Sequence, residues 1–164
     1  MGMRGKVGLI EPDDTLRPQV LSSLAGAGLQ AEPFESVREF LSFGGDDGYA
    51  VLVADERLDA LSVRDRLCSD GKWLAVIGYS SRPALRRVVA FMRSGGYDYF
   101  ALPIDIVELA RSLSQLGQGR SEYATARRRA AEARTRLRAL SPREGEVLEH
   151  MAAGRSNKTI GMDL

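Results

Sequence analysis

Residues 50–55 read Ala-Val-Leu-Val-Ala-Asp, an apolar run of strand length that ends at the carboxylate of Asp55. Five successive apolar side chains are typical of a strand buried on both faces, as in a parallel sheet covered by helices. Ligands of such sheets bind outside the carboxyl ends of the strands. Asp55 is therefore the first candidate functional residue, although an aspartate at a strand end can also be a turn or helix-cap residue.

Four other apolar runs have the length of strands, namely residues 7–10, 29–34, 73–78 and 97–101. Segments with helical spacing separate the runs, and the clearest of them are Leu85, Val88, Val89 and Met92, then Ile106, Leu109, Ala110 and Leu113. Alternating strands and helices predict an α/β fold. We expect a five-stranded, parallel, doubly wound sheet of flavodoxin-like order, followed by a long helix and a truncated all-α segment.

Short polar residues mark the expected starts of several helices. Ser36 and Asp105 each stand three residues before a glutamate, which is the spacing of a capping box. Thr15 is the expected N-cap of the first helix, since Pro18 then falls at the third helical position, where no N–H is needed.

The pattern changes after residue 116. Gly117 and Gly119 are expected to interrupt the helix, and residues 121–140 then run without glycine or proline. A heptad seam of a and d positions follows this segment, formed by Tyr123, Ala126, Ala130, Ala133, Leu137 and Leu140. Its layers are mostly alanine, so a weak coiled coil and a lone, arginine-decorated connecting helix both fit the pattern.

The last segment opens with a strong helix start. Ser141 is the expected N-cap, Pro142 the first helical residue and Glu144 the partner in a capping box. Gly154 is the expected end of this helix, and Ser156 can cap a second one. The two helices carry too few apolar side chains to bury a core, which indicates part of a larger domain. We expect three parts: residues 1–116, 117–140 and 141–164.

The composition of the 164 residues narrows the class of protein. One cysteine, Cys68, and one histidine, His150, exclude an internal disulfide framework and any site built from several cysteines or histidines. No apolar run approaches the ~18 residues of a membrane span, and the N-terminus reaches acidic residues too early for a secretory signal. These features favour a cytoplasmic protein that does not enter a membrane.

Charge is distributed unevenly along the chain. Residues 1–116 contain 13 basic and 16 acidic residues, a net charge of −3, whereas residues 117–164 contain 10 and 6, a net charge of +4. An acidic body with a basic tail is typical of a regulated module followed by a segment that meets nucleic acid. A solvated, arginine-rich helix gives the same pattern, so charge alone leaves both interpretations open.

Residues 6–116 resemble the receiver domain of two-component response regulators in their order of strands and helices and in residues at receiver-like places, which include Asp55, Ser80, Gly95, Asp98, Tyr99 and Pro103. The resemblance implies that a histidine kinase phosphorylates Asp55 while acidic residues hold Mg²⁺, a cation that prefers oxygen ligands. The metal ligands that the resemblance implies are Glu11, Asp13, Asp55 and the backbone carbonyl of Arg57. The resemblance also assigns Ser80 to the phosphoryl oxygens and makes Tyr99 the aromatic switch residue.

Two residues depart from the receiver pattern. Pro12 stands where the family usually has a second acidic residue, which leaves Asp13 one position late, and Leu102 stands where the family has its phosphoryl-binding lysine. A leucine cannot pair with a phosphoryl dianion. We therefore expect weak Mg²⁺ binding at most, and a receiver switched by something other than ordinary aspartyl phosphorylation. The family also implies a cis peptide bond between Leu102 and Pro103.

The receiver-like residues have simpler interpretations as well. Glu11 and Asp13 can start a helix, whose N-terminal dipole favours acidic residues. Ser80 can cap the following helix, and Tyr99 can be an ordinary core residue.

Residues 140–164 resemble the opening of a LuxR-type helix-turn-helix domain, through Leu-Ser-Pro-Arg-Glu-x-Glu-Val-Leu from Leu140 and Gly-Arg-Ser-Asn-Lys-Thr-Ile from Gly154. The resemblance implies a transcription regulator and not an enzyme. Regulators of this family bind DNA as homodimers, with a recognition helix in the major groove. That helix would lie after residue 164, so residues 1–164 alone are expected to bind DNA weakly and without sequence preference.

Two other functions stay open from the sequence. One is a phosphoacceptor regulator that a histidine kinase phosphorylates at Asp55. The other is a receiver-fold module that binds a partner protein or a small molecule.

Overall fold

The computed structural model describes residues 7–44 and 50–155. The chain divides into two compact units, Met1–Thr125 and Ala126–Leu164, and each is described by itself. Within the described residues, no helix has the length and apolar character that crossing a membrane requires.

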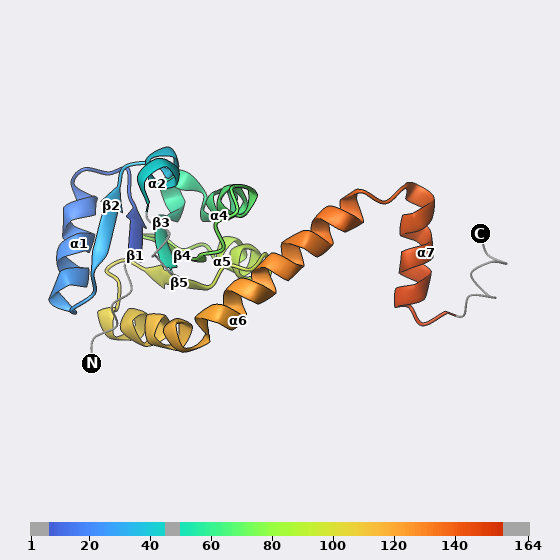
Figure 1. The fold of residues 1–164 in the computed structure, drawn as a ribbon. Helices are drawn as coiled ribbons and strands as arrows, with labels where there is room; N and C mark the ends of the chain where they lie inside the picture. Colours follow the sequence, from blue (N-terminus) through green and yellow to red (C-terminus); the bar gives the residue numbers. More distant parts are fainter. Residues whose placement is uncertain (1–6, 45–49, 156–164) are drawn as a thin grey trace. The chain divides into compact units, whose positions relative to one another are not determined.

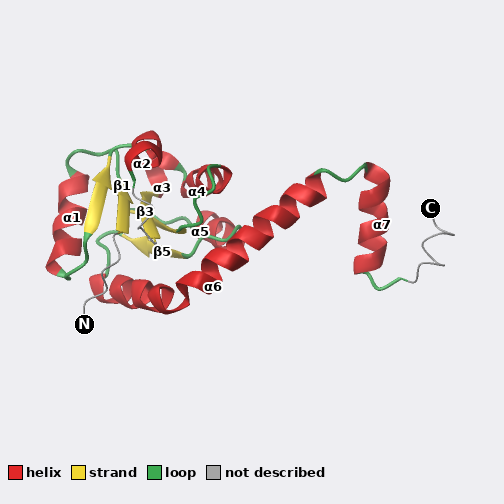
Figure 2. Ribbon diagram, viewed as in Figure 1, coloured by secondary structure: helices red, strands yellow, loops and turns green. Residues whose placement is uncertain are grey.

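The first unit is built on the parallel sheet that the apolar runs predict (Figures 1 and 2). Its strands are β1 (Val7–Ile10), β2 (Ala31–Phe34), β3 (Ala50–Ala54), β4 (Ala75–Ser80) and β5 (Asp98–Ala101). They are ordered β2-β1-β3-β4-β5, and every neighbouring pair is parallel. β2 begins at Ala31 rather than at residue 29, and β4 ends at Ser80 rather than at residue 78. The flavodoxin-like order is confirmed.

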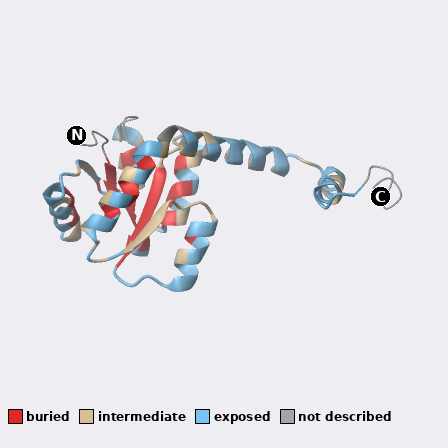
Figure 3. Ribbon diagram, turned by 90° about the horizontal axis from the view of Figure 1, so that it is seen from below, coloured by how far each residue is buried: buried red, intermediate tan, exposed pale blue. Residues whose placement is uncertain are grey.

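Helices cover both faces of the sheet (Figure 1). On one face, α1 (Leu16–Gly26) and the start of α6 (Ile106–Arg138) pack on the strands through Val20, Leu24, Leu109 and Leu113. On the other face, α2 (Val37–Phe43), α4 (Ala60–Ser69) and α5 (Leu85–Arg93) contribute Phe40, Val63, Leu67 and Phe91. All five residues of β3 are buried, and Figure 3 shows that burial concentrates in the strands and on the helix sides that face them. This is the doubly wound arrangement that the sequence predicts.

The expected helix starts are confirmed, but at one of them a different side chain makes the cap hydrogen bonds. The Ser36 hydroxyl accepts from the Glu39 amide at the start of α2, and Asp105 accepts from the Glu108 amide at the start of α6. Thr15 precedes α1, but its side chain makes no cap hydrogen bond. The carboxylate of Asp13 takes that role instead, because it accepts from the backbone amides of residues 15 and 16.

The expected interruption at Gly117 and Gly119 is wrong, since α6 runs without a break from Ile106 to Arg138. Glycine lowers helix stability by roughly 0.5–1 kcal/mol relative to alanine, which packing on either side can offset. Leu116 is buried before the glycines, and after them the ring of Tyr123 packs edge-to-face on Tyr97, with centroids 5.3 Å apart. The helix is therefore anchored to the sheet on both sides of its weak point.

In the second unit, α7 (Pro142–Ala152) begins as the sequence predicts. The Ser141 hydroxyl accepts from the Glu144 amide at 3.3 Å, and the Glu144 carboxylate accepts from the Ser141 amide at 2.8 Å, which completes the capping box. Gly154, with φ at 75°, ends the helix in the left-handed conformation that favours glycine. None of the α7 residues is buried. The expected second helix from Ser156 lies outside the described residues.

Candidate functional site

The carboxyl ends of four strands bring together four of the residues singled out from the sequence. Glu11 follows β1, Asp55 follows β3, Ser80 ends β4 and Tyr99 lies in β5. Because β1, β3, β4 and β5 are adjacent and parallel, these ends meet at one edge of the sheet. Glu11 is 0% exposed and Asp55 2% exposed. Carboxylates are rarely so buried without partners, so their partners decide what this edge can do.

Asp55 is held by donors on both of its carboxylate oxygens. Arg87 donates from Nε to Oδ2 at 2.7 Å and from Nη2 to Oδ1 at 3.1 Å. The Ala60 amide donates to Oδ1 at 2.9 Å, and the Tyr99 hydroxyl donates to Oδ2 at 2.7 Å. Burial raises the pKa of Asp55, but the hydrogen bonds from Arg87, Ala60 and Tyr99 outweigh it, and the pKa lies below its ordinary value. Asp55 is therefore an ionised carboxylate whose oxygens are already engaged.

Arg87, in the first turn of α5, is a site residue that the sequence reasoning missed. Besides its two bonds to the Asp55 carboxylate, it donates to the Asp55 carbonyl at 3.0 Å and pairs with Asp59 at 3.3 Å. Two parallel N–H···O bonds give the bidentate geometry that makes arginine–carboxylate pairs strong. The sequence signal is the Arg86-Arg87 dipeptide on an amphipathic helix, and it does not reveal which strand end the guanidinium reaches.

Glu11 and Asp13 lie beside Asp55 and share a second arginine, Arg57. Its Nη2 lies 2.5 Å from Oδ2 of Asp13, and its Nε lies 3.7 Å from Oε1 of Glu11. The buried hydroxyl of Tyr79 donates to Oε2 of Glu11 at 2.7 Å. Burial raises the pKa of Tyr79, and the bond to Glu11 raises it further, so this phenol stays a neutral donor. We call the edge formed by Glu11, Asp13 and Asp55 the acidic edge. Asp13 caps α1 and also belongs to this edge, so the helix-start interpretation and the site interpretation of this residue both hold.

Ser80 meets a carboxylate that was not anticipated, that of Glu56 in α3 (Asp55–Leu58). Oε1 of Glu56 accepts from the Ser80 hydroxyl at 2.6 Å, the Ser81 hydroxyl at 2.7 Å and the Arg82 amide at 2.9 Å. These three bonds hold the pKa of Glu56 at about 2, well below its ordinary value. The hydroxyl of Ser80 therefore already has an anionic partner, the carboxylate of Glu56.

Tyr99 directs its hydroxyl to Asp55 and its ring into the core. The ring packs edge-to-face on Phe91, with centroids 5.8 Å apart. Gly78 of β4 lies opposite, and a Cβ added there would stand 2.7 Å from ring carbons of Tyr99. The missing side chain at Gly78 is what leaves room for this ring position.

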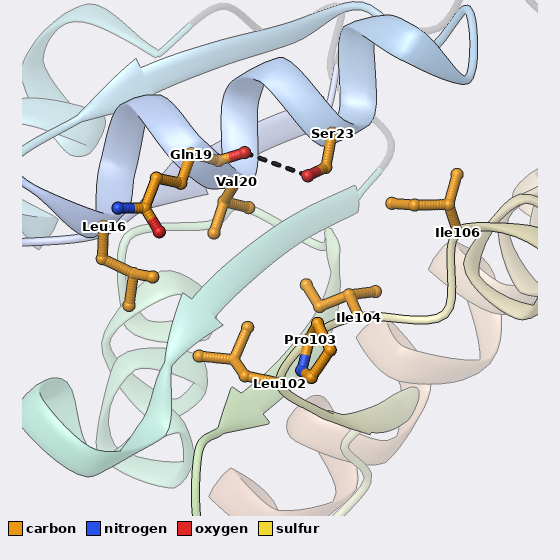
Figure 4. Close-up of a pocket in the computed structure, with 8 residues that line it drawn as sticks. All are labelled: Leu16, Gln19, Val20, Ser23, Leu102, Pro103, Ile104 and Ile106. Carbon is orange, nitrogen blue, oxygen red and sulfur yellow. Dashed lines mark hydrogen bonds between the residues drawn. The ribbon is translucent and has the colours of Figure 1, made fainter.

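Leu102 lies outside the acidic group and inside an apolar hollow of about 370 Å³. The hollow lies between α1 and the segment after β5, where Leu102, Pro103 and Ile104 face Leu16 and Val20 (Figure 4). The peptide bond between Leu102 and Pro103 is cis, which confirms the prediction. The position expected to hold a cation thus contributes an apolar side chain to packing on α1.

The acidic edge does not suit a Mg²⁺ ion. The expected ligand oxygens already accept hydrogen bonds from Arg57, Arg87, Tyr79 and Tyr99. Within residues 7–44 and 50–155, no group of three or more acidic, histidine or cysteine side chains has the arrangement of a metal site. Mg²⁺ needs oxygen ligands with near-octahedral geometry, so it would first have to displace the arginines.

The fold matches solved receiver domains. The response regulator receiver protein from Pseudoalteromonas atlantica superposes with a TM-score of 0.59 at 18% identity, covering 70% of this chain and 98% of that one. Full-length FixJ from B. japonicum superposes with a TM-score of 0.64 at 22% identity, covering 99% of this chain and 81% of that one. The first unit therefore has the receiver fold.

The sequence comparisons add the output part. Residues 138–164 match the family model of the bacterial regulatory proteins of the luxR family. The chain is 31% identical to the transcriptional regulatory protein FixJ of Azorhizobium caulinodans over 166 residues, covering 96% of this chain and 76% of the relative. It is 27% identical to the response regulator protein TodT of Pseudomonas putida over 168 residues, covering 100% of this chain and 74% of that protein. The chain belongs to the two-component response regulators that carry a LuxR-type DNA-binding domain.

Proposed function

We propose that this response regulator controls transcription through a receiver that is switched by something other than ordinary phosphorylation of Asp55. The observation that carries the proposal is the bidentate pair between Arg87 and Asp55. An aspartate receives a phosphoryl group on a carboxylate oxygen that must approach the phosphorus, with positive charge placed on the phosphoryl oxygens. Here the cation binds the carboxylate itself, and Tyr99 and Ala60 donate to the same two oxygens.

The balance of charge around the site supports the same conclusion. Arg87 faces Asp55, and Arg57 faces Asp13 and Glu11, so each carboxylate has a cation supplied by the chain. Leu102, at the family's lysine position, supplies no charge for an incoming phosphoryl group. A phosphodonor would have to replace these internal pairs before it gained any new contact.

The alternative of a phosphoacceptor regulator keeps one observation in its favour. Asp55 stands at the carboxyl end of the central strand β3, beside Glu11 and Asp13, where a receiver places its phosphorylation site. In that alternative, a histidine kinase and Mg²⁺ would displace Arg87 and Arg57 during transfer. A receiver-fold module that binds a partner protein or a small molecule remains a third proposal.

We further propose three parts for the chain: a receiver over residues 1–116, a helical linker over 117–140 and the start of a LuxR-type domain over 141–164. The match of residues 138–164 to the luxR family supports DNA as the partner of the complete output domain. A homodimer and a cytoplasmic location accompany this function, because regulators of this type read two DNA half-sites on the bacterial chromosome.

The proposal is tested by measuring promoter affinity before and after treatment with acetyl phosphate and Mg²⁺. A gel-shift titration of the regulator with its complete LuxR-type domain is expected to give the same dissociation constant in both states. A gain in affinity that disappears in an Asp55→Asn variant would establish the phosphoacceptor alternative instead.

A further inference from the structure

The carboxylate of Glu56 occupies a set of donors at the end of β4. We propose that Ser80, Ser81 and the Arg82 amide form an oxyanion cradle, and that Glu56 fills it as a built-in anionic ligand that keeps the receiver in one state. The inference rests on the proposed function, because it explains how the site can hold its arrangement without a phosphoryl group.

The geometry of the cradle is that of an anion site. Three donors from three consecutive residues, two hydroxyls and one backbone N–H, converge on a single oxygen, Oε1 of Glu56, at 2.6, 2.7 and 2.9 Å. The Arg82 amide also donates to the Ser80 hydroxyl at 3.0 Å, which orients that hydroxyl toward the carboxylate. Short charge-assisted bonds of this kind are the contacts that proteins offer to carboxylate and phosphoryl oxygens alike.

Glu56 is well placed to act as an internal ligand. It directly follows Asp55 in the first turn of α3, so the chain delivers the carboxylate to the cradle without a long excursion. Glu56 is an exposed residue, and its carboxylate oxygen Oε1 accepts from all three donors of the cradle. A free anion would have to compete with a carboxylate that is present at very high effective concentration.

Groups of the chain itself occupy both the cradle and the carboxylate of Asp55. Glu56 provides the anion for Ser80, while Arg87 and Tyr99 bind Asp55. Tyr99 is thereby directed inward with no modification of Asp55. In this proposal, a signal acts by displacing Glu56 or Arg87 from these contacts.

An anion-rescue experiment tests the cradle. Glu56→Ala empties it and leaves the three donors in place, so inorganic phosphate should bind there. The melting temperature of each variant is measured in phosphate and in chloride at equal ionic strength. Phosphate stabilises proteins generally through exclusion from their surfaces, and Glu122→Ala, which removes an exposed carboxylate of α6, supplies that background.

We expect Glu56→Ala to gain roughly 2–4 °C more than wild type and Glu122→Ala in phosphate. Adding Ser80→Ala to Glu56→Ala should remove most of this excess, and Glu56→Gln, whose amide oxygen can still fill the cradle, should show little of it. Equal shifts in Glu56→Ala and Glu122→Ala would overturn the cradle. Intact mass of wild type after treatment with acetyl phosphate and Mg²⁺ separates the two claims. If wild type stays unmodified and the melting temperatures of Glu56→Ala and Glu122→Ala shift equally in phosphate, the cradle is refuted and the proposed switching is not. If wild type becomes phosphorylated, the proposed switching is refuted.

Discussion

The guanidinium of Arg87 and the carboxylate of Asp55 form a bidentate pair across the edge of the sheet, at 2.7 and 3.1 Å. Asp55 is almost fully buried, while the Arg87 side chain remains 48% exposed. The pair therefore joins a fixed buried anion to a cation on the surface of α5. Any signal that draws the Arg87 side chain away would leave Asp55 without its principal partner, and the buried carboxylate would then need a new one.

Glu56 makes the stability of the receiver depend on pH in the acidic range. Its pKa lies at about 2 in the folded chain, against an ordinary value of 4.5. The unfolded chain binds the proton first as the pH falls, so the contribution of Glu56 is fully present above pH 4.5 and is lost toward pH 2. Urea unfolding of Glu56→Gln should show a shallower loss of stability over this interval than wild type. Glu122→Gln is the matched control and should keep the wild-type slope.

The dissociation constant of wild type for Mg²⁺ is expected to lie above the millimolar range, because Arg57 already pairs with Asp13 and Glu11. Arg57→Ala removes this cation and should tighten Mg²⁺ binding in isothermal titration calorimetry. Arg66→Ala, which removes only the surface pair with Asp70, should leave it unchanged. Saturation of wild type well below millimolar Mg²⁺ would show that the acidic edge is an ordinary metal site.

Gly78 sets the position of the Tyr99 ring. In Gly78→Ala, the new methyl group would stand 2.7 Å from the ring, so the Tyr99 hydroxyl must move away from Asp55. Overpacking of this kind destabilises by roughly 1–3 kcal/mol, measurable in urea unfolding. Gly26→Ala is the control, because a Cβ there meets nothing within 4 Å and should change stability by no more than about 0.5 kcal/mol. Equal effects at the two glycines would contradict this role of Gly78.

The proposed homodimer has two candidate surfaces. On α6, the ring of Tyr123 packs on Tyr97 within the same chain, so it does not contribute to the surface of the heptad seam. Leu137, another residue of the seam, is 51% exposed. On α5, Leu85 is 77% exposed. If the α6 seam carries the dimer, Leu137→Glu combined with Leu140→Glu should give a monomer by light scattering.

The matched variant for the second surface is Leu85→Glu combined with Met92→Glu, which should leave a dimer of the α6 seam intact. A monomer from this pair alone would assign the dimer to α5. A mass that neither pair of substitutions changes would exclude both surfaces.

The parts of the fold that depend on local pattern were predictable from the sequence. The buried run at 50–54, the caps at Ser36 and Ser141 and the order of the sheet follow from periodicity and capping chemistry. The continuity of α6 was not predictable, because it depends on the contact of Tyr123 with Tyr97, a residue 26 positions earlier in the chain. Long-range packing here outweighs the local preference of glycine.

Only part of the candidate site could be predicted, because the remaining contacts also depend on long-range packing. The sequence shows where each strand ends, and the parallel sheet brings these ends to one edge. The residues that could be placed in this way are Glu11, Asp13, Asp55, Ser80 and Tyr99. Arg57, Arg87 and Glu56 act through long, flexible side chains whose reach is not encoded in their spacing. These three side chains supply the charges that distinguish the site.

The most direct test of the account is the intact mass of the protein after incubation with acetyl phosphate and Mg²⁺. We compare wild type, Asp55→Asn and a variant that combines Arg57→Ala and Arg87→Ala with Leu102→Lys, which removes both arginine partners of the carboxylates and places a cation at the family's lysine position. Wild type and Asp55→Asn are expected to keep their mass, and the combined variant to gain one phosphoryl group. A phosphoryl group on wild type that is absent from Asp55→Asn would contradict the account, because Arg87 would then be no barrier to ordinary phosphorylation.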